Sequence, residues 1–289
     1  MAVIIPAGAE IPTPAPGPRR YGVFDAVVRG PLDNRYVASG VQFYPEDCGV
    51  GVLAYDPTCA PPHAEKVFDD TGAEFIEADP YWLYASYQCG TVGTSAGDVR
   101  RRVQKRYNAG AQHAVETTMW TGAGLTGVPA LTTAGAITVA PAGAGAGAAV
   151  AAAEQAFWDL HGYAGVLHVN TAAYAALAYA QMMTRAGGAG VFRTPLGTAL
   201  SLGAGYGVTG PAGVAPADGF VWAFITPQTY VWSTEVRQPD PVQTLDRLAN
   251  QWLALAETVY LHTWVCGDVV AVQIPVAAPA VATAPEVPA

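Results

Sequence analysis

Charged residues are scarce in this chain. Only 13% of its 289 residues are Asp, Glu, Lys or Arg, which is about half of the ~25% usual for soluble proteins. A surface with so little charge indicates that neighbouring molecules cover much of it, so the composition alone raises self-assembly as a hypothesis. Hydrophobic residues make up 51% of the chain, which is enough for one large or two small domains with a core.

Positive charge is the scarcer sign. The chain has 14 Lys and Arg against 23 Asp and Glu, so its net charge is −9 and its pI is about 4.9. Tight general binding of nucleic acid requires a basic face, and this balance argues against it. The composition still permits an acidic wall that faces nucleic acid without binding it tightly.

The sequence also lacks a hydrophobic run of the kind that crosses a membrane. Its nearly uncharged segment, residues 134–153, contains Pro141 and several glycines, which argue against a membrane helix. The first residues, MAVIIPAGAEIP, have no basic n-region and reach Pro6 too soon for a signal peptide. We therefore expect a soluble, cytoplasmic product without a membrane partner.

Four cysteines are too few for a disulfide scaffold in a chain of this length. Cys48 and Cys59 lie eleven residues apart. They permit three interpretations: free thiols, a disulfide formed after cell lysis, or a zinc site with His63 that lacks a fourth ligand. Cys89 and Cys266 are expected in strands, as small core residues. We predict no cofactor and no metal.

The strongest local signal is the stretch 95–120, which predicts one long helix. Ser95 can cap its start, and Asp98 completes a capping box in which Asp replaces the usual Glu or Gln. Gly122 and Gly124 then end the helix. Apolar residues recur every four positions and predict one buried stripe: Val99, Val103, Tyr107, Ala111, Val115 and Met119.

The opposite face of this helix holds five basic residues: Arg100, Arg101, Arg102, Lys105 and Arg106. They lie near the start of the helix, where its dipole disfavours cations. We therefore predict that they meet carboxylates of another subunit, with Glu74, Glu77 and Asp79 as candidates. The alternative is an ordinary solvated face on a core helix.

Two segments before the helix lack a core of their own. Residues 1–20 are rich in proline, which favours extended backbone, either as a disordered tail or as an arm that lies on another surface. Residues 36–90 predict a long hairpin with arms at 36–48 and 73–89. Because the loop between the arms is too long for a tight turn, we expect the hairpin to contact a neighbouring subunit more than its own core.

The second half of the chain predicts an α/β layer and several strands. The Gly/Ala run 142–149 is a flexible joint and a candidate domain boundary. Residues 148–161 predict a helix, 165–169 a buried strand and 171–185 a second helix. Further strands are expected at 198–203, 219–227, 229–236, 250–264 and 269–275. For 250–264 a strand is favoured over a helix because Thr, Val and Tyr fill its second half.

This order of parts resembles the major capsid proteins of tailed bacteriophages, which have the Hong Kong 97 fold, and most of all those of actinobacterial phages. The segment AVETTMWTGAGLTGVPALTT resembles the exit of their spine helix, and AEQAFWDLHGYAGVLHVNTAAYAALA resembles a helix, strand and helix of their A-domain. FRTPLGTALSLGAGY resembles the strand and loop that follow. The last segments, FVWAFITPQTYVWSTEV and NQWLALAETVYLHTWVCGDVVAVQIP, resemble the closing strands.

The resemblance covers roughly residues 20–276 and implies an α+β fold of the Hong Kong 97 type. Its parts would be an N-terminal arm (1–35), an extended β-hairpin or E-loop (36–90), a P-domain (91–145 and 241–267), an α/β A-domain (146–240 and 268–276) and an Ala/Pro tail (277–289). The P-domain would contain the spine helix at 95–120.

The same resemblance implies a structural protein that self-assembles into hexamers and pentamers of an icosahedral phage head. The head would enclose double-stranded DNA without sequence-specific binding, and the subunit would assemble in the bacterial host cytoplasm before residing in the virion capsid. A scaffolding protein, separate because no fused scaffolding domain precedes the arm, and a portal are implied partners, with decoration proteins as optional ones.

Two other functions remain open at this point. An encapsulin shell protein shares the fold but packages a cargo enzyme. An intracellular α/β enzyme with an unrecognised site is the alternative of another class, although the histidines at 113, 161, 168 and 262 form no triad that the spacing supports.

Some members of the capsid family carry an isopeptide crosslink, which by resemblance would involve Lys66, Asn250 and Glu257. A desolvated Lys is neutral and nucleophilic, a buried Glu accepts its proton, and Asn supplies the acyl group and releases ammonia. In the alternative, Glu257 pairs with an arginine at an interface and Lys66 is solvated. Because most members lack the crosslink, we expect a single band near the monomer mass of 29.9 kDa.

Overall fold

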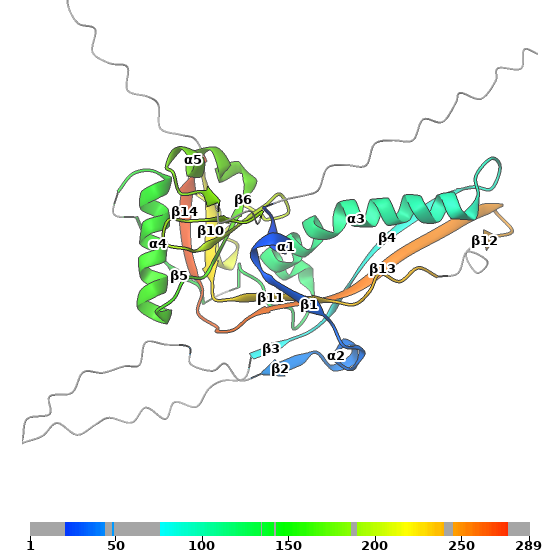
Figure 1. Cartoon of the computed structure of the whole chain (residues 1–289), viewed down its shortest axis with the longest axis horizontal. Coiled ribbons are helices and arrows are strands. Elements are labelled where there is room, and N and C mark those ends of the chain that lie inside the picture. Colours follow the sequence, from blue (N-terminus) through cyan, green and yellow to red (C-terminus); the bar gives the residue numbers. More distant parts are fainter. Residues whose placement is uncertain are drawn as a thin grey trace, which may run out of the picture.

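The chain folds around two β-sheets that lie end to end, each with one long helix against it (Figure 1). This description rests on a computed structural model and covers residues 21–43, 48, 76–133, 135–141, 143–185, 190–239 and 245–276. Helix α3 (Ala96–Thr121) runs along the first sheet, and α4 (Ala146–His161) covers the second. The predicted α+β mixture of helices and strands is confirmed.

The first sheet is built around the longest strand, β13 (Gln251–Trp264). On one side β4 (Tyr81–Gly90) pairs with it antiparallel along all ten of its residues. On the other side β13 pairs with β11 (Thr229–Ser233) and with the short β12 (Leu245–Asp246), and β1 (Val28–Pro31) adds to β11 in parallel. The predicted strand at 250–264 is confirmed.

Alternation along β4 and β13 gives this sheet one buried and one open face. Ala254, Ala256 and Tyr260 of β13 and Tyr81 of β4 pack in the core beneath α3. The opposite face carries the odd-numbered residues of β13 up to Glu257 and the even-numbered residues of β4. Side chains along a strand point alternately to the two faces, so one helix can cover only half of them.

Helix α3 forms as the sequence predicts. The Ser95 hydroxyl accepts from the Asp98 backbone N–H, and the Asp98 carboxylate accepts from the Ser95 N–H at 3.1 Å. Gly122 ends the helix in the left-handed conformation, at φ 69°. The whole predicted stripe, from Val99 to Met119, is buried in the core shared with the first sheet.

The second sheet has seven strands, in the order β5–β14–β10–β6–β9–β8–β7. Their bounds are β5 Ile137–Thr138, β6 Val166–Asn170, β7 Thr184–Arg185, β8 Phe192–Arg193, β9 Ala199–Gly203, β10 Phe220–Thr226 and β14 Val270–Pro275. Helix α4 packs Val150 and Phe157 into the core of this layer. Short 3-10 turns at Gly122–Gly124, Thr171–Ala173 and Pro211–Gly213 complete the described elements.

The second predicted helix of this layer, 171–185, is shorter than expected. Asn170, rather than Thr171, caps the turn by accepting from the Ala172 N–H at 2.9 Å. Helix α5 then spans only Tyr174–Tyr179. The chain leaves it through Gln181, at φ 56°, because residues 184–185 pair with β8 at the edge of the sheet. Sheet pairing therefore overrides the helical pattern there.

The hairpin predicted at 36–90 also spans fewer residues in the structure. Its start is helix α2 (Asn34–Ser39), and only β2 (Val41–Phe43) and β3 (Ile76–Ala78) form a two-stranded hairpin. The rest of the return arm, β4, belongs to the first sheet, so this part packs on its own chain and the expectation for it was wrong. The physical reason is that alternate residues of β4 are apolar and pack against the buried side of α3. Residues 49–75 lie outside the described part.

The sheets also divide the chain differently from the predicted segments. Strand β11, from the segment 146–240 that the resemblance assigns to the A-domain, pairs with β13 in the first sheet. Strand β1 and helix α1 (Val23–Ala26), which we had placed in the arm, belong to the body of the molecule, and Val23 is fully buried. No helix in the described part is long and apolar enough to cross a membrane.

Candidate assembly surface

The open face of the first sheet exposes large apolar side chains. On β4, Trp82 is 55% and Tyr84 71% exposed, and Leu253 on β13 is 40% exposed. The register places Trp82 opposite Val259 and Tyr84 opposite Glu257, so these side chains line neighbouring positions of one surface. Contiguous exposed apolar surface is typical of an interaction site. The sequence signal for this surface is the aromatic content of YWLYASYQ, in which Trp82 and Tyr84 occupy alternate positions.

A groove of about 750 Å³ adjoins this face beside α2. Its lining includes Trp82, Val259 and Glu257 of the first sheet and Val37 of α2. Glu257 and Arg237 exchange two backbone hydrogen bonds, at 2.8 and 3.0 Å, which fix the wall of the groove. Glu257 therefore lies where the aromatic rings of the open face meet a groove that also contains Asp33 and Glu235.

The basic residues of α3 lie on its outer side, as predicted. Arg101, Arg102, Lys105 and Arg106 are exposed, whereas Arg100 is half-buried. Some of them have partners within the chain: Arg101 forms an ion pair with Asp98, Arg102 donates to the Tyr87 hydroxyl at 2.9 Å, and Arg106 donates to the Ser86 carbonyl at 3.0 Å. These contacts join the helix to β4.

Hydrogen bonds with Ser95, and to a smaller extent the positive charges of Arg101 and Arg102, lower the pKa of the Asp98 carboxyl group. Of the acidic residues proposed as partners of the basic face, Glu77 and Asp79 are exposed near β3. Glu77 accepts from the Gln42 side chain at 2.8 Å, across the β2–β3 pair. Glu74 lies outside the described residues. Pairing between subunits stays a prediction.

The residues of the crosslink that the family resemblance raises do not form one site within the described part of the chain. Asn250 ends the turn before β13 and accepts from the Thr91 hydroxyl at 2.7 Å. Glu257 lies seven residues along the strand, roughly 23 Å away at about 3.3 Å per residue. Lys66 lies outside the described residues. A crosslink would therefore need Asn250 and Glu257 from different subunits. The expectation that the chains are not crosslinked stays a prediction.

One buried carboxylate joins the body of the molecule. Glu116 of α3 is 1% exposed. Its oxygens accept from the backbone N–H of Val23 at 3.2 Å and of Gly205 at 2.9 Å, and from the Gln112 side chain at 2.9 Å. A single side chain thus connects α1, the long helix and the loop after β9. The periodicity of the sequence did not indicate this role, because Glu116 is a single acidic residue beside the apolar stripe of α3.

Two buried histidines lie where the sheets meet. His262 of β13 contacts the Pro129 carbonyl through Nε2 at 2.7 Å and the Tyr81 hydroxyl through Nδ1 at 3.0 Å. Since a carbonyl only accepts, Nε2 carries the proton and Nδ1 accepts from Tyr81. Burial lowers the pKa of His262 to about 4, against a smaller opposing effect of the bond to Pro129.

His168 lies in the middle of β6, which pairs with β10 and β9 in the second sheet. Its ring nitrogens bond to the Tyr206 hydroxyl at 3.0 Å and the Thr226 hydroxyl at 2.9 Å. Burial, and secondarily the nearby His262, lowers its pKa to about 3. Both histidines therefore stay neutral in the folded chain and act as hydrogen-bonding elements of its core.

The cysteines pair differently from the predictions. Cys48 bonds to Cys266, which lies after the end of β13 rather than in a strand, and Cys89 of β4 is a half-buried free thiol. This bond matches none of the three interpretations offered for Cys48, which were a free thiol, a disulfide with Cys59 and a zinc site. Cys59 and His63 lie outside the described residues. Among the described residues no group of three His, Cys, Asp or Glu could hold a metal ion.

The fold is shared with known structures at low sequence identity. The capsid of the native GTA particle matches with a TM-score of 0.54 and 13% identity, covering 93% of this chain and 96% of that one. A structure from Microbacterium phage Oxtober96 matches at 0.53 and 11%, with coverage of 93% and 96%. The SrpI encapsulin of Synechococcus elongatus PCC 7942 matches at 0.53 and 11%, with coverage of 93% for both.

The chain has the Hong Kong 97-type fold. The match extends over nearly the full length of each chain, and the predicted fold is confirmed. No protein-family model and no curated protein matches the sequence. At 11–13% identity the match establishes the fold and leaves the function to be argued from the surfaces of this chain.

Proposed function

We propose that this chain is the major capsid protein of a tailed phage, a structural shell subunit that self-assembles around double-stranded DNA. The carrying observation is the fold, with its long helix and open sheet face, which it shares with the capsid of the GTA particle over 93% of the chain. The low charge content and the exposed aromatic residues of β4 add support, because both fit a surface that neighbouring subunits cover.

In this proposal the shell forms from hexamers and pentamers of the chain. The open face of the first sheet and its adjoining groove receive one neighbour, and the basic face of α3 meets carboxylates of another, with Glu74, Glu77 and Asp79 as candidates. Each exposed ion pair is worth only about 0–1 kcal/mol, so the apolar face contributes the larger part of the contact. Scaffolding, portal and decoration proteins remain proposed partners, and assembly in the host cytoplasm is part of the same hypothesis.

Expression of the chain, with and without a co-expressed scaffolding protein, tests the proposal. Electron microscopy and size-exclusion chromatography should show closed particles of uniform diameter. A chain that stays monomeric under both conditions would contradict a shell function and favour the enzyme alternative.

The contribution of the open face can be tested in the same assay. Replacement of Trp82 and Tyr84 by Ser should abolish or strongly reduce particle formation, since these side chains are 55% and 71% exposed and contribute little to the core. Tyr84→Phe is the matched control, because it keeps the ring and removes the hydroxyl. Unchanged thermal unfolding of the unassembled double variant would show that the fold is intact.

An encapsulin shell protein is the second candidate, because the SrpI encapsulin matches as well as the phage structure does. The two candidates differ in what the particle encloses. Particles isolated from the native source should contain double-stranded DNA if the capsid proposal is correct. Particles that instead contain an enzyme and no DNA would decide for the encapsulin.

A further inference from the structure

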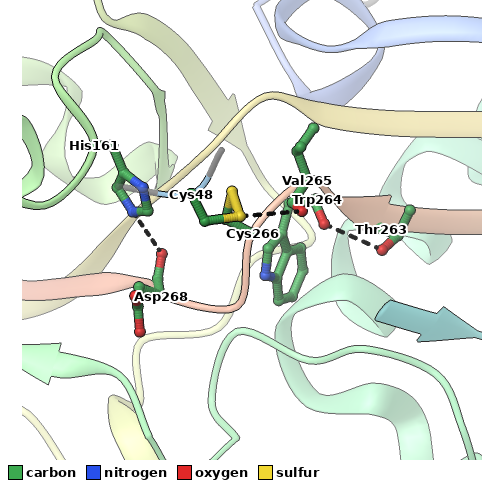
Figure 2. The surroundings of a disulfide bond; sticks show 7 residues. All are labelled: Cys48, His161, Thr263, Trp264, Val265, Cys266 and Asp268. Atoms are coloured by element: carbon green, nitrogen blue, oxygen red, sulfur yellow. Dashed lines mark hydrogen bonds between the residues drawn. A yellow bond between two sulfur atoms is a disulfide. The ribbon is translucent and has the colours of Figure 1, made fainter. Parts of the chain in front are cut away.

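Two cysteines that are 218 positions apart in sequence lie side by side in the fold. The Cα atoms of Cys48 and Cys266 are 5.6 Å apart and their sulfurs are bonded (Figure 2). That Cα separation is typical of protein disulfides. Neither residue belongs to the proposed assembly surface. No feature of the sequence indicates that these two cysteines pair.

Cys266 lies at the point where the chain crosses between the two sheets. It follows β13 of the first sheet and precedes β14 of the second, and it is 1% exposed. Two contacts hold the crossover in place. The Val265 N–H donates to the Gln228 carbonyl at 3.3 Å. The His161 ring contacts the Asp268 carbonyl at 3.3 Å, as Figure 2 shows. This cysteine is therefore fixed within the body of the molecule.

Cys48 lies on the other side of the bond, beyond the two-stranded β2–β3 hairpin. It follows β2 and is half-buried. The β2–β3 hairpin has only two strands, which are marginally stable alone. It is attached to the body through the Asp79 N–H, which donates to the Gly127 carbonyl at 2.9 Å, and through a small apolar cluster that contains Ala78 and Val259.

We propose that Cys48 and Cys266 form a redox-controlled anchor, which covalently fixes the β2–β3 hairpin to the crossover between the sheets. In a reducing cytoplasm both residues are thiols and the hairpin is held by its noncovalent contacts alone. Once an oxidant is present, the disulfide closes and the hairpin can no longer separate from the crossover. If the chain forms a shell, which rests on the proposed function, the disulfide closes only after the shell has left the cell.

The oxidation balances with a low-molecular-weight disulfide as the oxidant. The more exposed Cys48 thiolate attacks one sulfur of the oxidant and forms a mixed disulfide, which releases the first small thiolate. The Cys266 thiolate then attacks the Cys48 sulfur, forms the protein disulfide and releases the second. Two cysteine thiols lose two electrons and two protons, and the oxidant is reduced to two thiols.

Counting thiols tests the pairing. Cells that express the full chain are lysed into excess N-ethylmaleimide under denaturing conditions, and the adducts are counted by mass spectrometry. We expect all four cysteines to be modified. After native purification and incubation with oxidised glutathione, only Cys59 and Cys89 should be modified, and a peptide map should link Cys48 to Cys266. Four modified cysteines after oxidation, or a link between Cys48 and Cys59, would overturn the pairing.

Local dynamics test the anchoring. Oxidation should slow hydrogen exchange in β2 and β3 and raise Tm by on the order of 10 °C, because the bond closes a very long loop. The C59S/C89S variant keeps only the proposed pair and should respond like the wild type, whereas C48S should not respond. If the disulfide forms but exchange in β2 and β3 does not change, the anchor role is wrong.

The outcome is separable from that of the shell proposal. Thiol counts and hydrogen exchange are measured on the unassembled chain, whereas the shell proposal depends on particle formation. A chain that forms the disulfide anchor but never assembles would support the anchor and overturn the shell proposal. Particles that form without the disulfide would support the shell proposal and overturn the anchor.

Discussion

Acidification should destabilise the unassembled chain through its two buried histidines. The pKa of His168 is lowered to about 3 and that of His262 to about 4, against about 6.5 in an unfolded chain. Below pH 6.5 the unfolded state therefore binds protons that the folded state does not. Stability from these groups is present above pH 6.5 and is lost as the pH falls toward their folded pKa values.

The size of the effect follows from linkage. Each histidine that is protonated only in the unfolded state changes the free energy of unfolding by about 1.4 kcal/mol per pH unit. Between pH 7.5 and 5.0, each contributes a loss of about 2 kcal/mol, so the two together lower the stability by about 4 kcal/mol. That is a large part of the 5–15 kcal/mol typical of a folded protein.

Urea unfolding between pH 7.5 and 5.0, followed by tryptophan fluorescence, measures this slope. His262→Gln should halve it, because the glutamine amide can donate to Pro129 and accept from Tyr81 without titrating. His113→Gln, at an exposed position of α3, is the matched control and should keep the wild-type slope. Equal slopes for wild type and His262→Gln, or a stability that is flat down to pH 5.0, would refute the reasoning.

Three further predictions follow from other contacts. Gly203→Ala should lower the free energy of unfolding in urea by about 1–3 kcal/mol, because the added Cβ would lie 2.5 Å from the Glu116 carboxyl carbon. Gly90→Ala, which has open space around it, should leave that free energy nearly unchanged. Equal decreases for the two variants would contradict the role of Glu116. Charge reversal at Arg101 and Arg102 should reduce particle yield in electron micrographs while leaving the monomer folded, and normal yield would refute pairing between subunits. Boiled, reduced particles should run as a single band near 29.9 kDa; a ladder that disappears in Lys66→Ala would show the crosslink instead.

Local and periodic features were predictable from the sequence alone. Helix α3 was predicted from its cap at Ser95 to its stop at Gly122, because capping, the four-residue repeat and a terminal glycine all act within one segment. The long strand β13 was predictable for the same reason, from its β-branched and aromatic residues. The order of such elements was sufficient to indicate the fold.

Partners that lie far apart in sequence were decided by the tertiary structure. That β4 pairs with β13 rather than with the first arm of a hairpin depends on α3 covering the shared face. The neutral state of His262 depends on burial between two sheets, and the partner of Cys48 lies 218 residues away. Side-chain pattern determines which face of an element is buried, whereas the surface that buries it exists only once the chain has folded.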